Sequence, residues 1–250
     1  MSRKKQGRAG GAPLSWASRS GEDEHGLFAA LELEDVEQTL RWIPDGTFPF
    51  GVGRNPVTLT RGFWLADTPC TQALWEVVTG SNPSKWKEPE RPVERVSWDD
   101  CQVFLGALND RLPGLAARLP SEAEWERAAW GEELDGDVSD EDLIDDHAWW
   151  VGNSGLTTHP VGEKEPGCWG LHDMAGNVEE WCVDGYQRRF RRGPRVDPVV
   201  EYDGGSHIIK GGWWISPRGC GDPTWRNAAG PDYRAESTGF RIARSLDAFD

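Results

Sequence analysis

The residues best suited to chemistry lie in the stretch from Gly170 to Trp181. This stretch combines glycines and an asparagine, which accept positive φ angles, with carboxylates at Asp173 and Glu180. A loop of this kind can turn its carbonyl groups inward while carboxylates approach from either side, which is the outline of a calcium site. The alternative is that Asp173 and Asn177 only cap their own turn through side-chain to backbone hydrogen bonds.

The cysteines and histidines show no spacing typical of a metal or catalytic site. The five cysteines form an odd number without a CxxC pair, which favours reduced thiols over a disulfide framework or a zinc site. They are Cys70, Cys101, Cys168, Cys182 and Cys220. The histidines are scattered, and the carboxylates are too abundant for one pair to be singled out as general acid and base. No catalytic group is predicted from these residues.

Charge and composition narrow the class of protein. The formal net charge of −15 argues against a nucleic-acid or anionic-membrane binder and favours cationic partners. The 15 tryptophans supply large surfaces for burial, while 30 glycines and 17 prolines indicate a fold rich in turns. Residues 1–13 lack the apolar segment of a secretory signal and no stretch is long and apolar enough for a membrane span, so a cytoplasmic location is expected.

Periodicity and capping signals predict the elements that would position the loop. Residues 1–25 are interpreted as a flexible arm, and residues 26–250 as one domain. Strands are expected at 27–31, 39–43 and 57–66. Three helices are expected to begin after hydroxyl-bearing capping residues, which are Thr71, Ser97 and Ser121. The apolar face of the second helix has the spacing of an amphipathic helix and consists of Cys101, Phe104, Leu105 and Leu108.

An acidic segment at 132–146 stands apart from these elements. Its run from Asp135 to Asp140 resembles a calcium-binding EF-hand loop only weakly, because such a loop needs glycine at its sixth position and glutamate at its twelfth. Aspartate stands at both positions, as Asp140 and Asp146. We therefore expect a solvated acidic insertion, to which the sequence assigns no role.

The stretch from Gly170 to Trp181 also carries a family resemblance. Its pattern, Gly-Leu-x-Asp-Met-x-Gly-Asn-Val-x-Glu-Trp, resembles the signature of the formylglycine-generating enzyme (sulfatase-modifying factor) family. Other segments resemble further motifs of that family in the same order: Trp42–Gly51, Arg118–Glu126, Gly211–Trp214 and Gly239–Arg241. The resemblance implies an α+β, C-type-lectin-like single domain with twisted antiparallel strands, two main helices and much irregular loop. It also implies that the glycine pair and the final motif are core strands.

The resemblance implies a structural calcium ion in the loop. The matching ligands would be Asp173 and Glu180 through their side chains, and Gly176 and Val178 through their carbonyl groups. Calcium accepts such mixed carboxylate and carbonyl shells, completed by water. A second calcium site of some members begins at an asparagine that here falls near Ala148, so that second site is not expected.

The catalytic residues of the family are not matched. The resemblance implies copper(I) held by two cysteines, with a serine directly after the glycine pair. Aligned on Gly211–Gly212, the serine falls at Trp213 and the two cysteines fall at Ser216 and Gly221. Cys220 lies one place away and is a weak catalytic candidate, because one thiol cannot give the two-thiolate coordination that suits copper(I). Copper binding is therefore not expected.

The residues between the last two motifs are typical of a binding surface. We call residues 213–238 the closing segment; it is rich in tryptophan, tyrosine and arginine, which dominate binding hot spots. The candidate contacts are Trp213, Ser216, Arg218, Asp222, Trp225, Asn227, Tyr233 and Arg234. A core position is the alternative for Trp214 and Trp225.

Two classes of function remain open. Variable proteins of diversity-generating retroelements resemble this family, catalyse nothing and diversify the same segment. The sequence therefore predicts a non-catalytic module that binds a protein or other ligand through the closing segment. The alternative is an oxidoreductase of the formylglycine-generating type that acts on a protein cysteine, or another enzyme of the family with an altered site.

Overall fold

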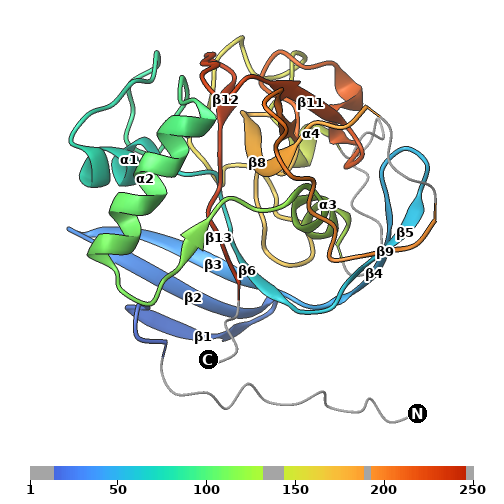
Figure 1. The fold of residues 1–250 in the computed structure, drawn as a ribbon. Coiled ribbons are helices and arrows are strands. Elements are labelled where there is room, and N and C mark those ends of the chain that lie inside the picture. The colour runs from blue at the N-terminus through green and yellow to red at the C-terminus, as the bar shows by residue number, and fades with distance from the viewer. Residues whose placement is uncertain (1–13, 132–143, 189–192, 246–250) are drawn as a thin grey trace.

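The predicted N-terminal strands belong to a large antiparallel sheet (Figure 1). The computed structural model describes residues 14–131, 144–188 and 193–245. Within them the sheet follows the order β1-β2-β3-β6-β13-β7, with β1 Arg19–Asp23, β2 Gly26–Leu33, β3 Val36–Ile43, β6 Phe63–Ala66, β13 Ala243–Ser245 and β7 Ala117–Arg118. Because β13 lies between β6 and β7, the last described strand completes a sheet that the first strands begin.

The described part of the predicted N-terminal arm is folded. β1 pairs with β2 along its whole length, and Trp16 is only 4% exposed in the main core. The prediction of a flexible arm through residue 25 is therefore wrong for residues 14–25. A turn at Gly26, with φ of 104°, lets a polar segment pair at the edge of the sheet. Residues 1–13 lie outside the described residues.

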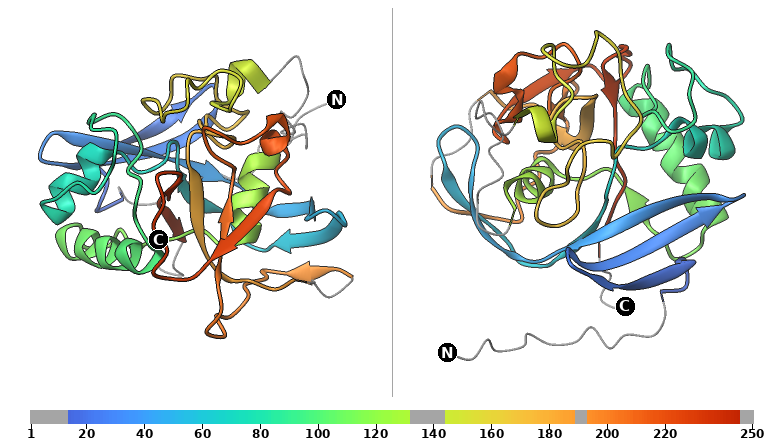
Figure 2. Two further views of the ribbon diagram at one scale, coloured as in Figure 1. Left: turned by 90° about the horizontal axis from the view of Figure 1, so that it is seen from above. Right: turned by 180° about the vertical axis from the view of Figure 1, so that it is seen from behind.

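The three predicted helices are confirmed at their predicted caps. α1 Gln72–Thr79 begins after Thr71, and α2 Trp98–Arg111 and α3 Glu122–Trp130 begin with capping boxes at Ser97 and Ser121. α1 and α2 lie side by side next to the large sheet (Figure 2). The predicted face of α2 is buried in the main core, so the amphipathic spacing was read correctly.

Two smaller sheets complete the described fold. One has the order β11-β10-β8-β12, with β11 Arg226–Ala229, β10 His207–Lys210, β8 Glu179–Gly185 and β12 Thr238–Gly239. The other has the order β4-β5-β9, with β4 Gly46–Phe50, β5 Asn55–Leu59 and β9 Arg195–Val196. The strand expected at 57–66 is thus two strands, β5 and β6, which belong to different sheets.

The architecture agrees with the predicted α+β class of mostly antiparallel strands. A short helix, α4 Ile144–His147, and a 3-10 turn, η1 Arg218–Gly221, lie with β11 and β12 at the end of the molecule away from β1–β3 (Figure 1). Most of the predicted acidic insertion, residues 132–143, lies outside the described residues. In the described parts of the chain, none of the helices is long and apolar enough to cross a membrane.

Candidate functional site

Polar side chains tie the loop before β8 to a neighbouring segment. The carboxylate of Asp173, a residue with φ of 54°, accepts hydrogen bonds from the Gly162 N–H at 2.8 Å and from the Asn177 amide at 3.2 Å. The Asn177 side chain also accepts from the N–H of His159 and donates to its carbonyl, at 3.0 and 3.1 Å. Both side chains therefore hold backbone groups, although these belong to residues 159–162 and not to their own turn.

Glu180, the second predicted carboxylate ligand, points into the core. Its two oxygens each accept a 2.6 Å hydrogen bond from the Arg241 guanidinium, and Oε2 accepts a 2.7 Å bond from Nε1 of Trp125. The same guanidinium donates to the carbonyls of His172 and Asp173 at 3.0 and 3.3 Å. A buried cation of the protein itself therefore neutralises Glu180.

These contacts do not fit the calcium cage that the resemblance implies. Calcium would have to compete with a bidentate guanidinium for Glu180. Gly176 is fixed against the backbone, since a Cβ there would lie 2.0 Å from the carbonyl oxygen of Trp149. Among the described residues, no group of three or more histidine, cysteine, aspartate or glutamate side chains could hold a metal ion. Calcium binding stays a prediction of the sequence.

The positions of the family's copper cysteines lie in a turn that follows β10. Gly211 and Gly212 have φ angles of 92° and 67°, so the strand expected there is wrong; the chain leaves β10 and reverses. Ser216 is 1% exposed, and its hydroxyl accepts a 2.9 Å bond from the Trp213 N–H. Burial raises the pKa of the Cys220 thiol to about 12, so this thiol stays protonated at neutral pH.

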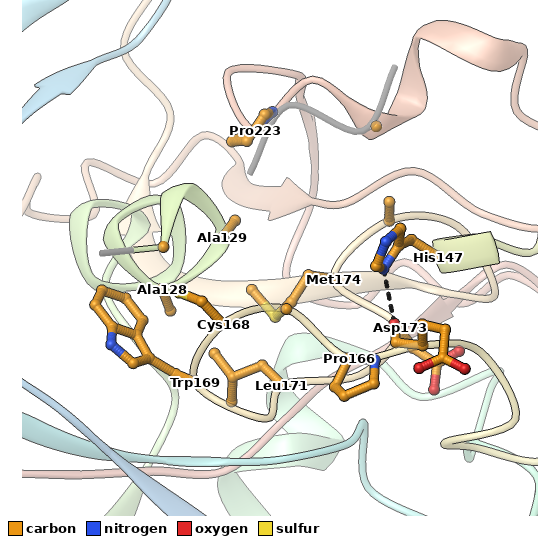
Figure 3. Close-up of a pocket in the computed structure, with 15 residues that line it drawn as sticks. Ala128, Ala129, His147, Pro166, Cys168, Trp169, Leu171, Asp173, Met174 and Pro223 are labelled. Atoms are coloured by element: carbon orange, nitrogen blue, oxygen red, sulfur yellow. Dashed lines mark hydrogen bonds between the residues drawn. The ribbon is translucent and has the colours of Figure 1, made fainter. Parts of the chain in front are cut away.

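A pocket of about 240 Å³ opens beside this turn (Figure 3). Its described lining comes from the ends of α3 and α4, the loop before β8, and η1 with the residues after it: Ala128, Ala129, Gly131, His147, Glu165, Pro166, Gly167, Cys168, Trp169, Leu171, Asp173, Met174, Ala175, Gly221 and Pro223. Gly221, which lines the pocket, aligns with the second copper-binding cysteine of the family. This position therefore carries no thiol in this chain. Cys168 is exposed, and His147 forms a 2.9 Å bond with the Glu165 carbonyl.

The predicted contacts of the closing segment differ in exposure. Trp225 is 36% exposed and Tyr233 44%, and Asn227 and Arg234 are also exposed. Trp213, Trp214, Arg218 and Asp222 are half-buried. Ser216 is buried within the turn, so its direct role is to hold the backbone of that turn.

A loop that was not predicted as part of the site flanks the closing segment. The Val151 N–H donates to the Ser216 carbonyl at 3.1 Å, and the Ser154 hydroxyl donates to the Trp214 carbonyl at 2.6 Å. Val151 and Leu156 in this loop and Ile215 in the closing segment are exposed aliphatic side chains. The apolar character of this loop was visible in the sequence, but its place beside the closing segment was not.

A buried charge network behind β11 was also missed. Lys210 is fully buried, with Nζ 3.0 Å from Glu126 and 3.9 Å from Glu122. Arg226 approaches the Glu122 carboxylate at 2.8 and 3.0 Å. Burial raises the pKa of Glu122 to about 7, against the lowering effect of Lys210 and Arg226. The network ties β10 and β11 to α3, and so supports the base of the closing segment. The spacing of Glu122 and Glu126 on one helix face was its sequence signal.

The fold and the sequence motifs together assign this chain to one family. The chain belongs to the family described as the sulfatase-modifying factor enzyme 1-like domain, whose family model matches residues 25–246. It is similar to the chaperone protein LppX of Paenibacillus barcinonensis, with 29% identity over 245 residues, 76% of this chain and 82% of that protein.

It is also similar to the formylglycine-generating enzyme of Thermomonospora curvata, with 32% identity over 193 residues. That match covers 68% of this chain but only 61% of the enzyme.

Solved structures confirm the predicted fold. Treponema denticola variable protein 1 has a TM-score of 0.79 and 26% identity, covering 88% of this chain and 99% of that one. PvdO from Pseudomonas aeruginosa shares the fold with a TM-score of 0.71 and 24% identity, covering 92% and 99% of the two chains. The family and the formylglycine-generating-enzyme type of C-type-lectin-like fold are therefore as predicted.

Proposed function

We propose that this protein is a non-catalytic binding module whose closing segment forms the ligand-binding surface. The observation that carries the proposal is that Trp225, Asn227 and Tyr233 are exposed on the closing segment, whose strands β11 and β12 pair with the buried strands β10 and β8. Side chains displayed on such a support lose little freedom on binding, which lowers the entropic cost of association. The likeness to a variable protein over nearly its whole length supports the same function.

The residues at the catalytic positions support a binding function over oxidation of a protein cysteine. A hydroxyl stands at Ser216, a glycine at Gly221, and the thiol of Cys220 is buried and protonated. The enzyme alternative rests on the pocket that Gly221 lines, because this pocket could accept a substrate side chain. Stoichiometric copper(I) binding together with conversion of a cysteine peptide to formylglycine would favour that alternative.

Site-specific photocrosslinking tests the binding surface. A benzoylphenylalanine at Asn227 should crosslink a partner in the host cell. The matched control is the same group at Val103 on α2, which is 73% exposed and should not crosslink that partner. The captured protein, once purified, should bind the wild type and lose affinity for Asn227→Ala and Tyr233→Ala but not Val103→Ala. Equal affinity for all of these variants would exclude the closing segment as the binding surface.

We extend the proposal to the partner and location. The net charge of −15 supports a protein or other ligand with basic groups, and disfavours nucleic acid and anionic membranes. A cytoplasmic location remains our expectation, and fractionation of the host cell with an antibody against the folded protein would test it.

A further inference from the structure

Glu179 is a buried carboxylate beneath the closing segment. It occupies the variable position of the loop motif, directly before Glu180, and is 3% exposed. Its oxygens accept hydrogen bonds from the Asn227 amide at 3.2 Å, the Ser237 hydroxyl at 3.3 Å and the Thr238 hydroxyl at 3.0 Å. All three donors are neutral.

No cation of the described residues neutralises Glu179. Ion pairs neutralise some buried carboxylates, as in Glu180 with Arg241 and Glu126 with Lys210, but none includes Glu179. Asp173 and Asp184 are also buried without an ion pair, but backbone N–H groups donate to them, whereas the donors to Glu179 are side chains, all three from the closing segment. Burial is the main cause that raises the pKa of Glu179, and hydrogen bonds from Asn227, Thr238 and Ser237 only partly offset it. An ionised carboxylate in such a place weakens the fold, because neutral donors replace only part of its hydration.

The three donors place this carboxylate at the predicted binding surface. Asn227 lies in β11, and Ser237 and Thr238 lie where the closing segment returns to the sheet at β12. Tyr233 lies between β11 and β12 and is exposed. Burial and the neighbouring charge of Glu179 raise the pKa of the Tyr233 hydroxyl. A ligand that covers Asn227 and Tyr233 would therefore approach an uncompensated negative charge.

We propose that Glu179 is the anchor for a cationic side chain, an arginine guanidinium or a lysine ammonium, presented by a protein partner. The proposal rests on the proposed function, because it assumes that the partner covers the closing segment. The cation's N–H groups take the place of the Asn227 amide on the carboxylate, and its charge supplies the compensation that the chain lacks. The Tyr233 ring offers a face to the same cation. The buried, unneutralised charge of Glu179 weakens the fold until a bound cation neutralises it, and such a loss of stability is typical of functional sites.

A minimal probe tests the anchor without a known partner. N-acetyl-arginine methylamide is titrated into the full chain while NMR follows the side-chain amide of Asn227 and the ring of Tyr233. N-acetyl-citrulline methylamide, which has the same shape without the charge, is the control ligand. We expect saturable shifts with the arginine probe and none with citrulline.

The matched variants are Glu179→Gln, which keeps an acceptor for Ser237 and Thr238, and Glu32→Gln on the exposed surface of β2. Affinity for the arginine probe should fall at least about tenfold in Glu179→Gln and stay unchanged in Glu32→Gln. Equal affinity in Glu179→Gln, absence of saturable binding to the wild type, or equal binding of citrulline would each overturn the anchor.

A second readout applies if Glu179→Gln fails to fold. Saturation with the arginine probe should lower the pKa of the wild-type Glu179 carboxyl, followed by its ¹³C shift, because a bound cation favours the ionised form. An unchanged pKa at saturation would overturn the proposal. Failure of the anchor is distinguishable from failure of the proposed function: a crosslinked partner whose affinity depends on Tyr233 but not on Glu179 would remove the anchor and retain the binding surface.

Discussion

Two neighbouring glutamates on β8 face two different environments. Glu180 lies in the core, where Arg241 and Trp125 donate to both of its oxygens. Glu179 lies on the side of the closing segment, where an amide and two hydroxyls are its only hydrogen-bond donors among the described residues. Alternation along a strand sends the two side chains to opposite faces, so one residue of sequence separates a structural ion pair from an uncompensated charge.

The difference between the two environments predicts different effects of the two glutamates on stability. Glu180 has a cationic partner within the chain, and removing either Glu180 or Arg241 leaves a buried ion. Glu179, beneath the closing segment, is buried without a cation, so removing its negative charge should stabilise the fold. The same chemical change, glutamate to glutamine, is therefore expected to have opposite effects at adjacent positions.

The largest expected effect is that of Glu180→Gln. This change leaves the Arg241 guanidinium buried without its counter-charge, and should lower the free energy of unfolding by about 3–5 kcal/mol. Urea denaturation followed by tryptophan fluorescence measures it, and Glu32→Gln, at an exposed position, should stay within about 0.5 kcal/mol of the wild type. A loss below 1 kcal/mol in Glu180→Gln would contradict the assigned core ion pair.

The pH dependence of stability should reveal the buried network on α3. Burial raises the pKa of Glu122 to about 7 in the folded protein, against an ordinary value of 4.5. The folded state therefore binds the proton more tightly than the unfolded state, so Glu122 makes the protein more stable as the pH falls from above 7 towards 4.5, by on the order of 1–3 kcal/mol.

The measurement is a series of urea titrations between pH 8 and pH 5 on the wild type and Glu122→Gln. The variant should lose part of the increase in stability at lower pH. An identical slope in both proteins would show that Glu122 does not titrate in this window. Asp145→Asn on α4 is a control in an exposed position.

Glu179→Gln should stabilise the protein. Because burial raises the pKa of Glu179, the ionised form weakens the fold above that pKa, and the effect disappears below the ordinary value of 4.5, where both states are protonated. At pH 8 the gain should be about 0.5–2 kcal/mol, the range of common stabilising substitutions. Thermal melts at pH 8 and pH 4 measure it. Destabilisation at pH 8 would mean that Glu179 has a structural role like that of Glu180.

Surface changes in the closing segment should hardly alter stability unless the side chain hydrogen-bonds to Glu179. Tyr233→Ala removes an exposed side chain and should stay within about 0.5 kcal/mol of the wild type. Asn227→Ala also removes a hydrogen-bond donor from the buried Glu179 carboxylate, so it should cost about 1–3 kcal/mol. Affinity for a crosslinked partner should change far more. If both variants unfold the protein, the segment is part of the core and the proposed function fails.

The smallest expected effect is that of chelation. Because Arg241 takes both oxygens of Glu180, we expect EDTA to leave the melting temperature unchanged, although the sequence predicted a structural calcium ion. Saturating calcium at a hundred times its Kd would stabilise by about 2.7 kcal/mol, a shift that a melt detects easily. A lower melting temperature in EDTA, with one calcium per chain by elemental analysis, would restore the predicted site and require Arg241 to move.

Much of the fold was readable because its signals are local. The caps at Thr71, Ser97 and Ser121 depend on hydroxyl groups and on residues within one helical turn, so the sequence located α1, α2 and α3 but not the short α4. The family motifs were also readable, because each is a short stretch in a known order. By contrast, the glycine pair Gly211–Gly212 was taken for a strand, since glycines permit either a strand or a turn and only the neighbouring turn with Ser216 decides.

The sequence by itself determined the family, the helices, the net negative charge and the lack of a cysteine pair at the copper positions. Tertiary structure alone decided which acidic residue is neutralised and which is not. Arg241 reaches Glu180 across 61 positions, and Asn227 reaches Glu179 across 48, so no local pattern reports either contact. The environment of a charge depends on groups brought together by the packing of distant strands, so the loop motif predicted a carboxylate at Glu180 but not the arginine that pairs with it.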